Sequence, residues 1–239
     1  MVNLKDKMNI KIYADGADLS SFEELNKNPK ISGFTTNPSL MKKSGVTDYK
    51  KFAKEVLKIV KKKPVSFEVF TDDINEMEAQ AREISTWGKN IYVKIPITNS
   101  KNVKTNQIIK KLSDDKIKCN VTAVFTIDQV QDVINVVENN TDLIISIFAG
   151  RIADTGLDPI NTMKEAIKLC KSKKNIEILW ASTREIFNVV QANNINCHII
   201  TVPNSILLKM SNFGKNLEKL SLETVNSFLI DAQKSGFKI

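Results

Sequence analysis

Apolar residues along this chain occur in two alternating patterns, short continuous runs and longer stripes at helical spacing. Residues 91–98 (IYVKIPIT) show the first pattern, a run rich in Ile and Val between polar segments. Runs of this length and composition are typical of parallel strands that are buried on both faces. Eight segments read this way, namely residues 10–15, 33–36, 65–70, 91–98, 117–125, 143–149, 176–181 and 197–202.

The second pattern separates these runs. Residues 46–63 place Tyr49, Phe52, Val56 and Val60 three or four positions apart, so one face of a helix is apolar. Further helices are expected over residues 20–28, 74–87, 102–112, 127–138 and 158–173, from residue 184 to 192, and over 205–234 with a break near Gly214. Either Asp72 or Asp73 is a candidate cap for the helix over residues 74–87, and Thr126 is the candidate for the helix over residues 127–138.

Eight strands that alternate with helices, at the roughly 25–30 residues a β/α unit requires, predict a parallel sheet. No linker or low-complexity tract divides the chain. We therefore expect an α/β fold, one (β/α)₈ (TIM) barrel domain over residues 1–239 with C-terminal helices at about 205–235. A doubly wound open sheet is the alternative. It is disfavoured because no glycine-rich phosphate loop follows the first strand.

Composition narrows the class of protein. The 239 residues are 42% hydrophobic and 26% charged, as in ordinary globular enzymes. No apolar run reaches the roughly 18 residues that span a bilayer, and the start MVNLKDKMNI lacks a signal-peptide core, so a cytoplasmic protein without membrane contact is expected.

The net charge is +8, but the lysines are spread over many helices without a nucleic-acid-binding motif. We expect no nucleic-acid partner and interpret the charge as an attraction for anionic, phosphorylated substrates.

The cysteines and the single histidine are interpreted as structural. Cys119, Cys170 and Cys197 lie far apart in apolar segments without a CxxC pair, which predicts reduced, buried thiols. His198 begins an apolar run and has no second histidine with which to bind a metal. No metal site is expected.

Lys94 is the candidate with the clearest chemistry. A lysine inside an apolar strand must reach water, pair with an acid or lose its proton, because desolvation disfavours the charged form. An unprotonated amine can add to a ketone and form a Schiff base, which then accepts electrons from a breaking carbon–carbon bond. A lysine that only forms a salt bridge or extends to the surface is the alternative.

Other polar residues fall near the ends of the expected strands. In a barrel of this kind the active site lies at the C-terminal ends of the strands. Asp15, Glu68 and Thr122 are suitable types for moving protons, the threonine through a held water. Arg151, Arg184 and Ser182 could bind a phosphate, with a loop salt bridge as the alternative for each arginine. The remaining polar candidates are Asn37, Asn120 and Ser146.

Several short motifs together resemble one family. TTNPS (35–39), VKIP (93–96), CNVTAVF (119–125), FAGRI followed by Asp154, and AS-x-R (181–184) occur in the order and approximate spacing of the transaldolase family. With YAD-x-AD at residues 13–18, the resemblance covers nearly the whole chain.

The resemblance implies a class I barrel enzyme without a metal or organic cofactor, acting on a ketose phosphate donor and an aldose phosphate acceptor. In it Lys94 forms the Schiff base with a dihydroxyacetone unit, and Asp15 is the acid/base where the bond breaks. Glu68 and Thr122 position a water. The implied substrate-binding residues are Asn37, Asn120 and Ser146 for the donor's hydroxyls, Arg151, Ser182 and Arg184 for the phosphate, and Phe148.

The same family includes fructose-6-phosphate aldolases, which release the three-carbon unit instead of transferring it. These carry a Tyr and a Gln where this chain has Phe148 and Glu68, so the resemblance favours transfer. Gly16, Ile147 and Thr183 depart from the family pattern and leave open the sugars and the pathway, whether pentose phosphate or specialised.

A non-catalytic sugar-phosphate-binding barrel is a further alternative. A barrel that had lost its activity would be expected to lack Lys94 or one of its acids, and all are present. A homo-oligomer is also left open, with the helix from Ser221 onward as the candidate contact.

Overall fold

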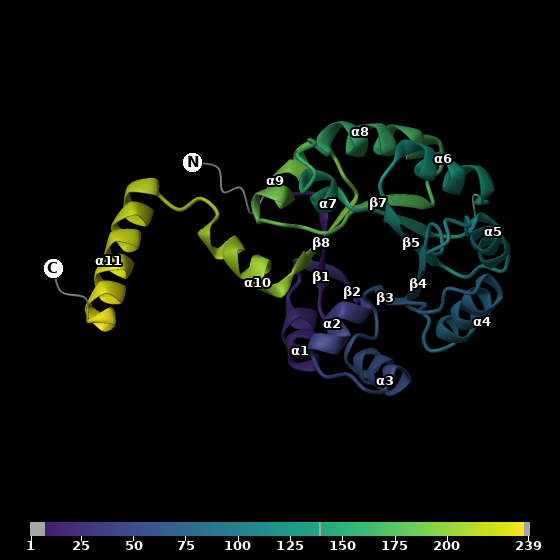
Figure 1. Ribbon diagram of the computed structural model, residues 1–239, viewed down its shortest axis with the longest axis horizontal. Coiled ribbons are helices and arrows are strands. Elements are labelled where there is room, and N and C mark those ends of the chain that lie inside the picture. Colours follow the sequence, from purple (N-terminus) through teal and green to yellow (C-terminus); the bar gives the residue numbers. More distant parts are fainter. Residues whose placement is uncertain (1–7, 139, 237–239) are drawn as a thin grey trace.

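The computed structural model describes residues 8–138 and 140–236. Eight parallel strands form a barrel in chain order, and β1 pairs with β8 to close it (Figure 1). The expectation of a (β/α)₈ barrel is confirmed, and the open sheet is wrong. The strands are β1 Lys11–Asp15, β2 Ile31–Thr35, β3 Val65–Glu68, β4 Ile91–Pro96, β5 Cys119–Val124, β6 Leu143–Ile147, β7 Ile176–Trp180 and β8 Ile199–Pro203.

Each of the eight apolar runs overlaps a strand, and most runs extend past the paired residues. Val69, Ile97 and Ala149 follow the ends of β3, β4 and β6 and are buried without belonging to the strands. β2, in contrast, extends beyond its predicted run at the N-terminal end, because it begins at Ile31, two residues before the expected start. Apolar character reports burial, whereas strand limits depend on backbone pairing with the neighbouring strand.

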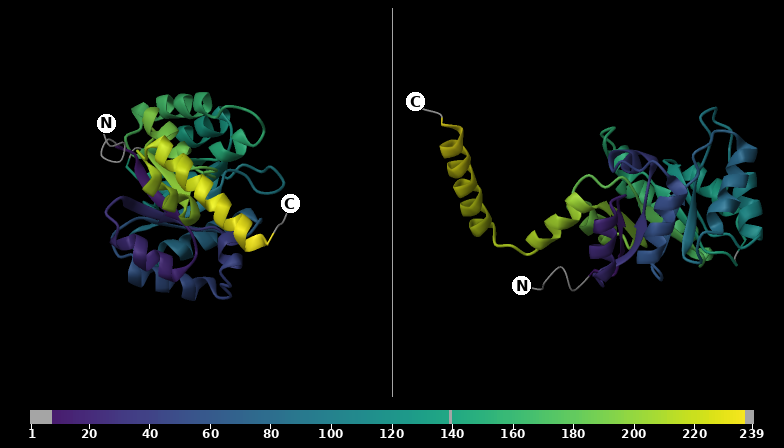
Figure 2. Two further views of the ribbon diagram at one scale, coloured as in Figure 1. Left: turned by 90° about the vertical axis from the view of Figure 1, so that its left-hand side faces the viewer. Right: turned by 90° about the horizontal axis from the view of Figure 1, so that it is seen from below.

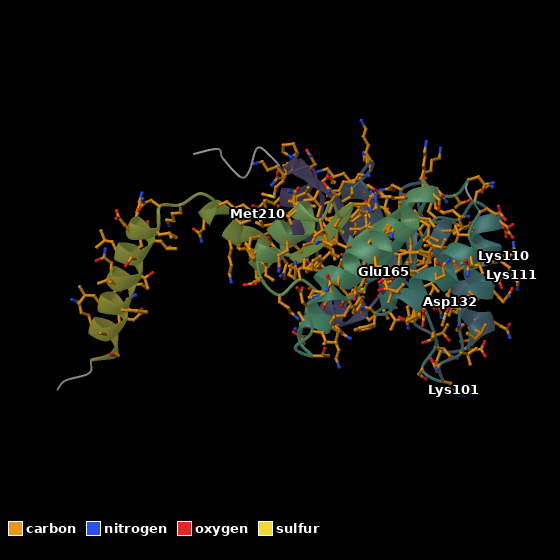
Figure 3. All side chains as sticks on the ribbon, turned by 90° about the horizontal axis from the view of Figure 1, so that it is seen from above. Lys101, Lys110, Lys111, Asp132, Glu165 and Met210 are labelled. Atoms are coloured by element: carbon orange, nitrogen blue, oxygen red, sulfur yellow. The ribbon has the colours of Figure 1, made fainter. Side chains whose placement is uncertain are left out.

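Helices surround the barrel, as Figures 1 and 2 show. They are α1 Leu19–Lys27, α2 Pro38–Lys43, α3 Tyr49–Ile59, α4 Ile74–Ser85, α5 Asn106–Asp114, α6 Ile127–Val136, α7 Ala149–Ala153, α8 Ile160–Leu169, α9 Phe187–Asn194, α10 Asn204–Leu207 and α11 Leu217–Ser235, with 3₁₀ turns η2 Cys170–Ser172 and η3 Leu208–Asn212. Asp73 and Thr126 cap α4 and α6 as expected. The short helices α2 and α7 were not predicted, because five or six residues are too few to show a helical period.

Each strand has an outward and an inward face. Ile91, Val93 and Ile95 of β4 pack in the large apolar cluster between barrel and helices, while Tyr92 belongs to a smaller cluster inside the barrel. Tyr13 fills the interior beside Gly33, where an added Cβ would lie 2.6 Å from its ring, so only glycine fits there. The alternation of a strand therefore directs every second residue of β4, Lys94 included, into the barrel.

The three cysteines and the single histidine have the structural surroundings expected of them. Cys119, Cys170 and Cys197 are free and buried, and burial raises the pKa of each thiol to about 12. His198 accepts a hydrogen bond at Nδ1 from the backbone N–H of Ile178 (3.0 Å).

The C-terminal helix stands apart from the barrel in all three figures. The chain leaves β8 through α10 and η3, passes Gly214 in the left-handed region (φ +77°), and continues as α11. The predicted break near Gly214 is confirmed. No residue of α11 is buried, and Leu217 and Phe228 are 78% and 68% exposed. Among the described residues, no helix is both long and apolar enough to cross a membrane.

Candidate active site

A cavity of about 480 Å³ opens at the C-terminal ends of the strands. The lining includes ten of the eleven residues predicted for the site, namely Asp15, Asn37, Glu68, Lys94, Thr122, Ser146, Phe148, Arg151, Ser182 and Arg184. Asn120 is the one that does not line the cavity. The closed barrel thus brings together side chains from strands that are far apart in sequence.

Lys94 lies at the floor of this cavity and pairs with an acid. Its side chain is 10% exposed, and Nζ lies 3.0 Å from Oε2 of Glu68. Nζ also donates a hydrogen bond to the carbonyl oxygen of Thr36 (2.9 Å). Glu68 and Lys94 are register partners on β3 and β4, so both side chains point to the same face. Three possibilities were considered for a lysine in an apolar strand, and the structure shows the one in which the lysine pairs with a carboxylate.

Asp15 ends β1 on the opposite side of the same floor. Its Oδ1 accepts a hydrogen bond from the hydroxyl of Thr35 (2.8 Å). Burial raises the pKa of Asp15 above its ordinary value, while the charge of Lys94 and the bond from Thr35 oppose that shift. A carboxyl group whose pKa is raised can both take and return a proton more readily near neutral pH.

Thr122 presents a buried hydroxyl with no hydrogen-bond partner among the described protein atoms. It sits at an irregularity in the β5–β6 pairing, and the next residue, Ala123, has φ +58°. A left-handed alanine costs about 1–2 kcal/mol, and β-bulges next to sites commonly redirect a side chain. An unpaired buried hydroxyl costs about 1–3 kcal/mol, so a substrate oxygen or a water bound here would recover that energy.

Asn120 lies below the cavity floor, fully buried. Its Oδ1 accepts from Ser146 Oγ (2.6 Å) and its Nδ2 donates to Ser66 Oγ (3.0 Å). In this arrangement Asn120 orients Ser146, which does line the cavity. Asn37 caps α2 by accepting from the N–H of Leu40 (2.9 Å), which leaves its amide nitrogen as the group that can donate to a substrate.

The rim of the cavity is cationic and depends on a close backbone approach. The N–H of Gly150 donates to the carbonyl oxygen of Ala181 (3.3 Å), and a Cβ at Gly150 would lie 1.6 Å from the carbonyl oxygen of Ser182. Only glycine permits that contact. It brings Arg151, which follows Gly150, beside Ser182 and Arg184, and Ser182 itself adopts φ +63°.

The two arginines have different partners. Arg184 binds Asp154, donating from Nε to both carboxylate oxygens (3.1 Å each) and from a terminal nitrogen as well. The arginine lowers the pKa of Asp154. The loop salt bridge considered for each arginine is therefore present for Arg184. Arg151 lies over the ring of Phe148 (5.1 Å) and forms no ion pair within the described residues, although its charge helps to lower the pKa of Asp154.

Sequence reasoning missed four groups at this site. Thr35 and Thr201 line the floor, the carbonyl of Thr36 holds Lys94, and Asp154 holds Arg184. Thr201 lay inside an apolar run, and its position two residues before the strand end was the available signal. Within residues 8–138 and 140–236, no three metal-binding side chains converge.

The fold and the site together define a (β/α)₈ barrel protein that carries a lysine–carboxylate pair, largely shielded from solvent, at the C-terminal ends of its strands. Residues 12–239 match the family model Transaldolase/Fructose-6-phosphate aldolase. The chain belongs to this family. It is 33% identical to a "Probable transaldolase" of Thermoanaerobacter sp. (strain X514), over 96% of this chain and all of the relative. A "Probable transaldolase" of Clostridium kluyveri is 35% identical, over 84% of this chain and 89% of the relative.

Solved structures support the fold alone. The crystal structure of KGPDC from Streptococcus mutans is similar with a TM-score of 0.53 and 8% identity. The match covers 82% of this chain and 89% of that one. At this identity the likeness concerns the barrel and not its chemistry.

Proposed function

We propose that this protein is a transaldolase that moves a dihydroxyacetone unit from a ketose phosphate to an aldose phosphate through a Schiff base on Lys94. The observation that carries the proposal is the Lys94–Glu68 pair, 3.0 Å apart and enclosed in the barrel, with Asp15 on the same floor. Membership of the family supports the same reaction class.

The first steps use the pair directly. Glu68 takes a proton from Nζ of Lys94, and the neutral amine attacks the ketone carbon of the donor. The carbonyl oxygen takes one proton from the attacking nitrogen and a second from Glu68 and leaves as water, and the product is a protonated imine. Thr122, whose hydroxyl is free to bind that water, and Glu68 hold it as it leaves and later when it returns for hydrolysis.

Asp15 acts in the next step. Its carboxylate takes the proton from the hydroxyl on the carbon beyond the bond that breaks. That carbon becomes an aldehyde, the carbon–carbon bond pair moves into the imine, and the enzyme-bound three-carbon unit is an enamine. A second aldose then enters, the enamine attacks its aldehyde, and Asp15 returns the proton to the new hydroxyl. Each proton taken is thus given back.

The rim of the cavity carries the groups proposed to bind the phosphate of the substrate. Arg151 forms no ion pair in the part of the chain that the structure describes, and Ser182 lines the same cavity. A phosphate bound there would receive charge-assisted hydrogen bonds. Arg184 contributes the nitrogen not engaged by Asp154.

Fructose-6-phosphate aldolase activity is the second candidate. Release of free dihydroxyacetone requires a proton on the enamine carbon. Phe148 lines the cavity without a hydroxyl, and its ring is covered by Arg151. The lack of a donor at this position favours transfer. A barrel that only binds sugar phosphates would have no use for the buried Lys94–Glu68 pair.

Borohydride trapping tests the chemistry. The protein is incubated with fructose 6-phosphate, reduced, digested and mapped by mass spectrometry. We expect a reduced three-carbon or six-carbon adduct on Lys94 and none in a Lys94→Met variant. An adduct on another lysine, or none, would contradict the proposal.

A second assay separates transfer from cleavage. Adding erythrose 4-phosphate or glyceraldehyde 3-phosphate should speed consumption of the donor and yield the exchanged ketose. Release of dihydroxyacetone at the same rate with and without acceptor would identify the protein as an aldolase.

We propose further that copies of this chain associate through α11. Leu222, Val225 and Phe228 are exposed on a helix that contributes nothing buried to its own barrel. An apolar groove of about 230 Å³, lined by Phe22 and Leu25 among others, opens beside α10, from which the chain's own α11 leads away. The occupant proposed for this groove is α11 of a second copy.

Sedimentation measures the association. Phe228→Asp should lower the molecular mass in solution toward that of one chain, because a charge on the apolar face opposes burial. Ser227→Asp places the same charge at a polar position of α11 and should leave the mass unchanged. A single-chain mass for the unaltered protein would overturn the proposal.

A further inference from the structure

Three side chains on three adjacent strands form a continuous hydrogen-bond chain that ends on Asp15. Thr35 Oγ1 on β2 lies 2.8 Å from Oδ1 of Asp15 on β1, and 2.5 Å from Oγ1 of Thr201 on β8. Both threonines are buried. β1 pairs with both β2 and β8, so barrel closure is what brings Thr35 and Thr201 together across 166 residues of sequence.

The direction of this chain follows from counting protons. An ionised carboxylate can only accept hydrogen bonds, so Thr35 donates its single hydroxyl proton to Asp15. Thr35 then has no proton left for Thr201. The short contact between the two hydroxyls must therefore be a bond that Thr201 donates to Thr35. Thr201 is fixed in turn by its own backbone, whose carbonyl accepts from the hydroxyl of Thr183 (2.7 Å).

The chain also distinguishes the two oxygens of Asp15. Oδ1 is occupied by Thr35, whereas Oδ2 has no hydrogen-bond partner within the part of the chain that the structure describes. The charged groups that face Asp15 are Lys94 on β4 and Glu68 on β3, while β2 and β8 offer only the uncharged Thr35, Thr201 and Pro203. Among the described residues, the hydroxyl of Thr35 is the side-chain group that binds the carboxylate on that side, and Thr201 acts on it through Thr35.

We propose that Thr201 and Thr35 form a one-way hydrogen-bond relay that stabilises the ionised form of Asp15 and holds its Oδ2 toward the substrate. This inference rests on the proposed function, because it concerns the acid/base of that reaction. Thr201 is a positioning residue: it acts on Asp15 through Thr35. Its donated proton makes the Thr35 hydroxyl a stronger donor, since linked hydrogen bonds polarise one another.

The test removes one hydroxyl. Thr201→Val keeps the shape of the side chain but cannot donate, so Thr35 loses its fixed orientation and Asp15 loses support for its charge. We expect kcat for transfer to fall about tenfold, the value of one hydrogen bond, with KM little changed. The acidic limb of the kcat/KM profile should move to higher pH, because a less stabilised carboxylate binds its proton more readily.

Two further variants make the result specific. Thr201→Ser keeps the hydroxyl and should restore both kcat and the acidic limb. Thr141→Val removes another buried threonine hydroxyl, one that donates to the carbonyl of Ser113 (2.6 Å) outside the cavity. It should lower thermal stability without moving the pH profile, as any purely structural loss would.

Borohydride trapping keeps this inference apart from the proposed function. Imine formation uses Lys94 and precedes the step that needs Asp15, so Thr201→Val should give a normal adduct on Lys94. If the unaltered protein gives no adduct, the proposed function fails. If the adduct forms but the pH profile of Thr201→Val matches that of the unaltered protein, the relay is overturned and the function stands.

Discussion

The two ends of the barrel carry cavities of similar size and different chemistry. At the N-terminal ends of the strands, a cavity of about 630 Å³ is lined by Tyr13, Tyr92 and His198 and by Lys11 and Glu177. At the C-terminal ends the cavity is smaller, about 480 Å³. Volume alone would favour the N-terminal end, opposite to the proposed active site.

What differs is how the charged groups are paired. Lys11 and Glu177 form an ion pair at 2.8 Å with both side chains open to solvent, which contributes little, and His198 binds a backbone amide. At the other end Lys94 and Glu68 are enclosed, Asp15 has a raised pKa, and Thr122 lacks a partner among the described residues. Enclosed titratable groups that are close together, and a polar atom left unpaired among the described residues, support the proposal of an active site at this end better than cavity size does.

The largest effect is expected from a substitution in β4, the strand whose residues Tyr92 and Lys94 line the cavities at opposite ends of the barrel. Lys94→Met should lower transfer by about 10⁴-fold or more, since no other group can form the imine, with the circular dichroism spectrum unchanged. Tyr92→Phe, two residues earlier on β4, removes a polar group at the opposite end and should leave the rate near that of the unaltered protein. Equal losses from both variants would break the distinction between the ends.

Asp15→Asn should lower transfer by about 10²–10⁴-fold, the usual share of a positioned acid/base.

The folded protein holds the Asp15 proton more tightly than the unfolded chain does, so ionisation of Asp15 reduces stability as pH rises above its ordinary pKa of 3.8. The variant should therefore unfold at higher urea concentration than the unaltered protein at pH 8. Urea titrations at pH 8 and pH 4 measure this, and the gain should shrink at the lower pH.

Thr122→Val removes the buried hydroxyl that lacks a partner among the described residues. If the hydroxyl binds the water of that step, imine formation should slow by about tenfold. The rate at which borohydride-trapped adduct accumulates measures this. Stability should stay the same or rise, because no protein hydrogen bond is lost. A clear loss of stability at an unchanged rate would assign Thr122 to structure instead.

The smallest effect should come from His198, at the opposite end. Burial lowers its pKa, so the folded protein favours the neutral imidazole. The stability this contributes is present above the ordinary pKa of 6.5 and is lost as pH falls through the lower folded value. His198→Gln should reduce the difference in urea midpoint between pH 8 and pH 5.5 and leave transfer unaffected.

The sequence determined the fold class and most of the site. Eight apolar runs at β/α spacing predicted a parallel sheet buried on both faces, and the lack of a glycine-rich phosphate loop favoured a closed barrel over an open sheet. The family motifs pointed to Lys94, Asp15 and Glu68, which the structure brings to one cavity, because these polar residues lie within or at the ends of apolar strands and break the apolar pattern there.

Tertiary structure decided how these residues meet. Asn120 lies beneath the cavity and Thr201 enters it, although one looked like a binding residue and the other like part of an apolar run. Both outcomes follow from strand alternation and from the level each strand reaches in the barrel, which depend on pairing between segments distant in sequence. The chain determines which residues are polar, and closure of β1 against β8 determines which of them share a hydrogen bond.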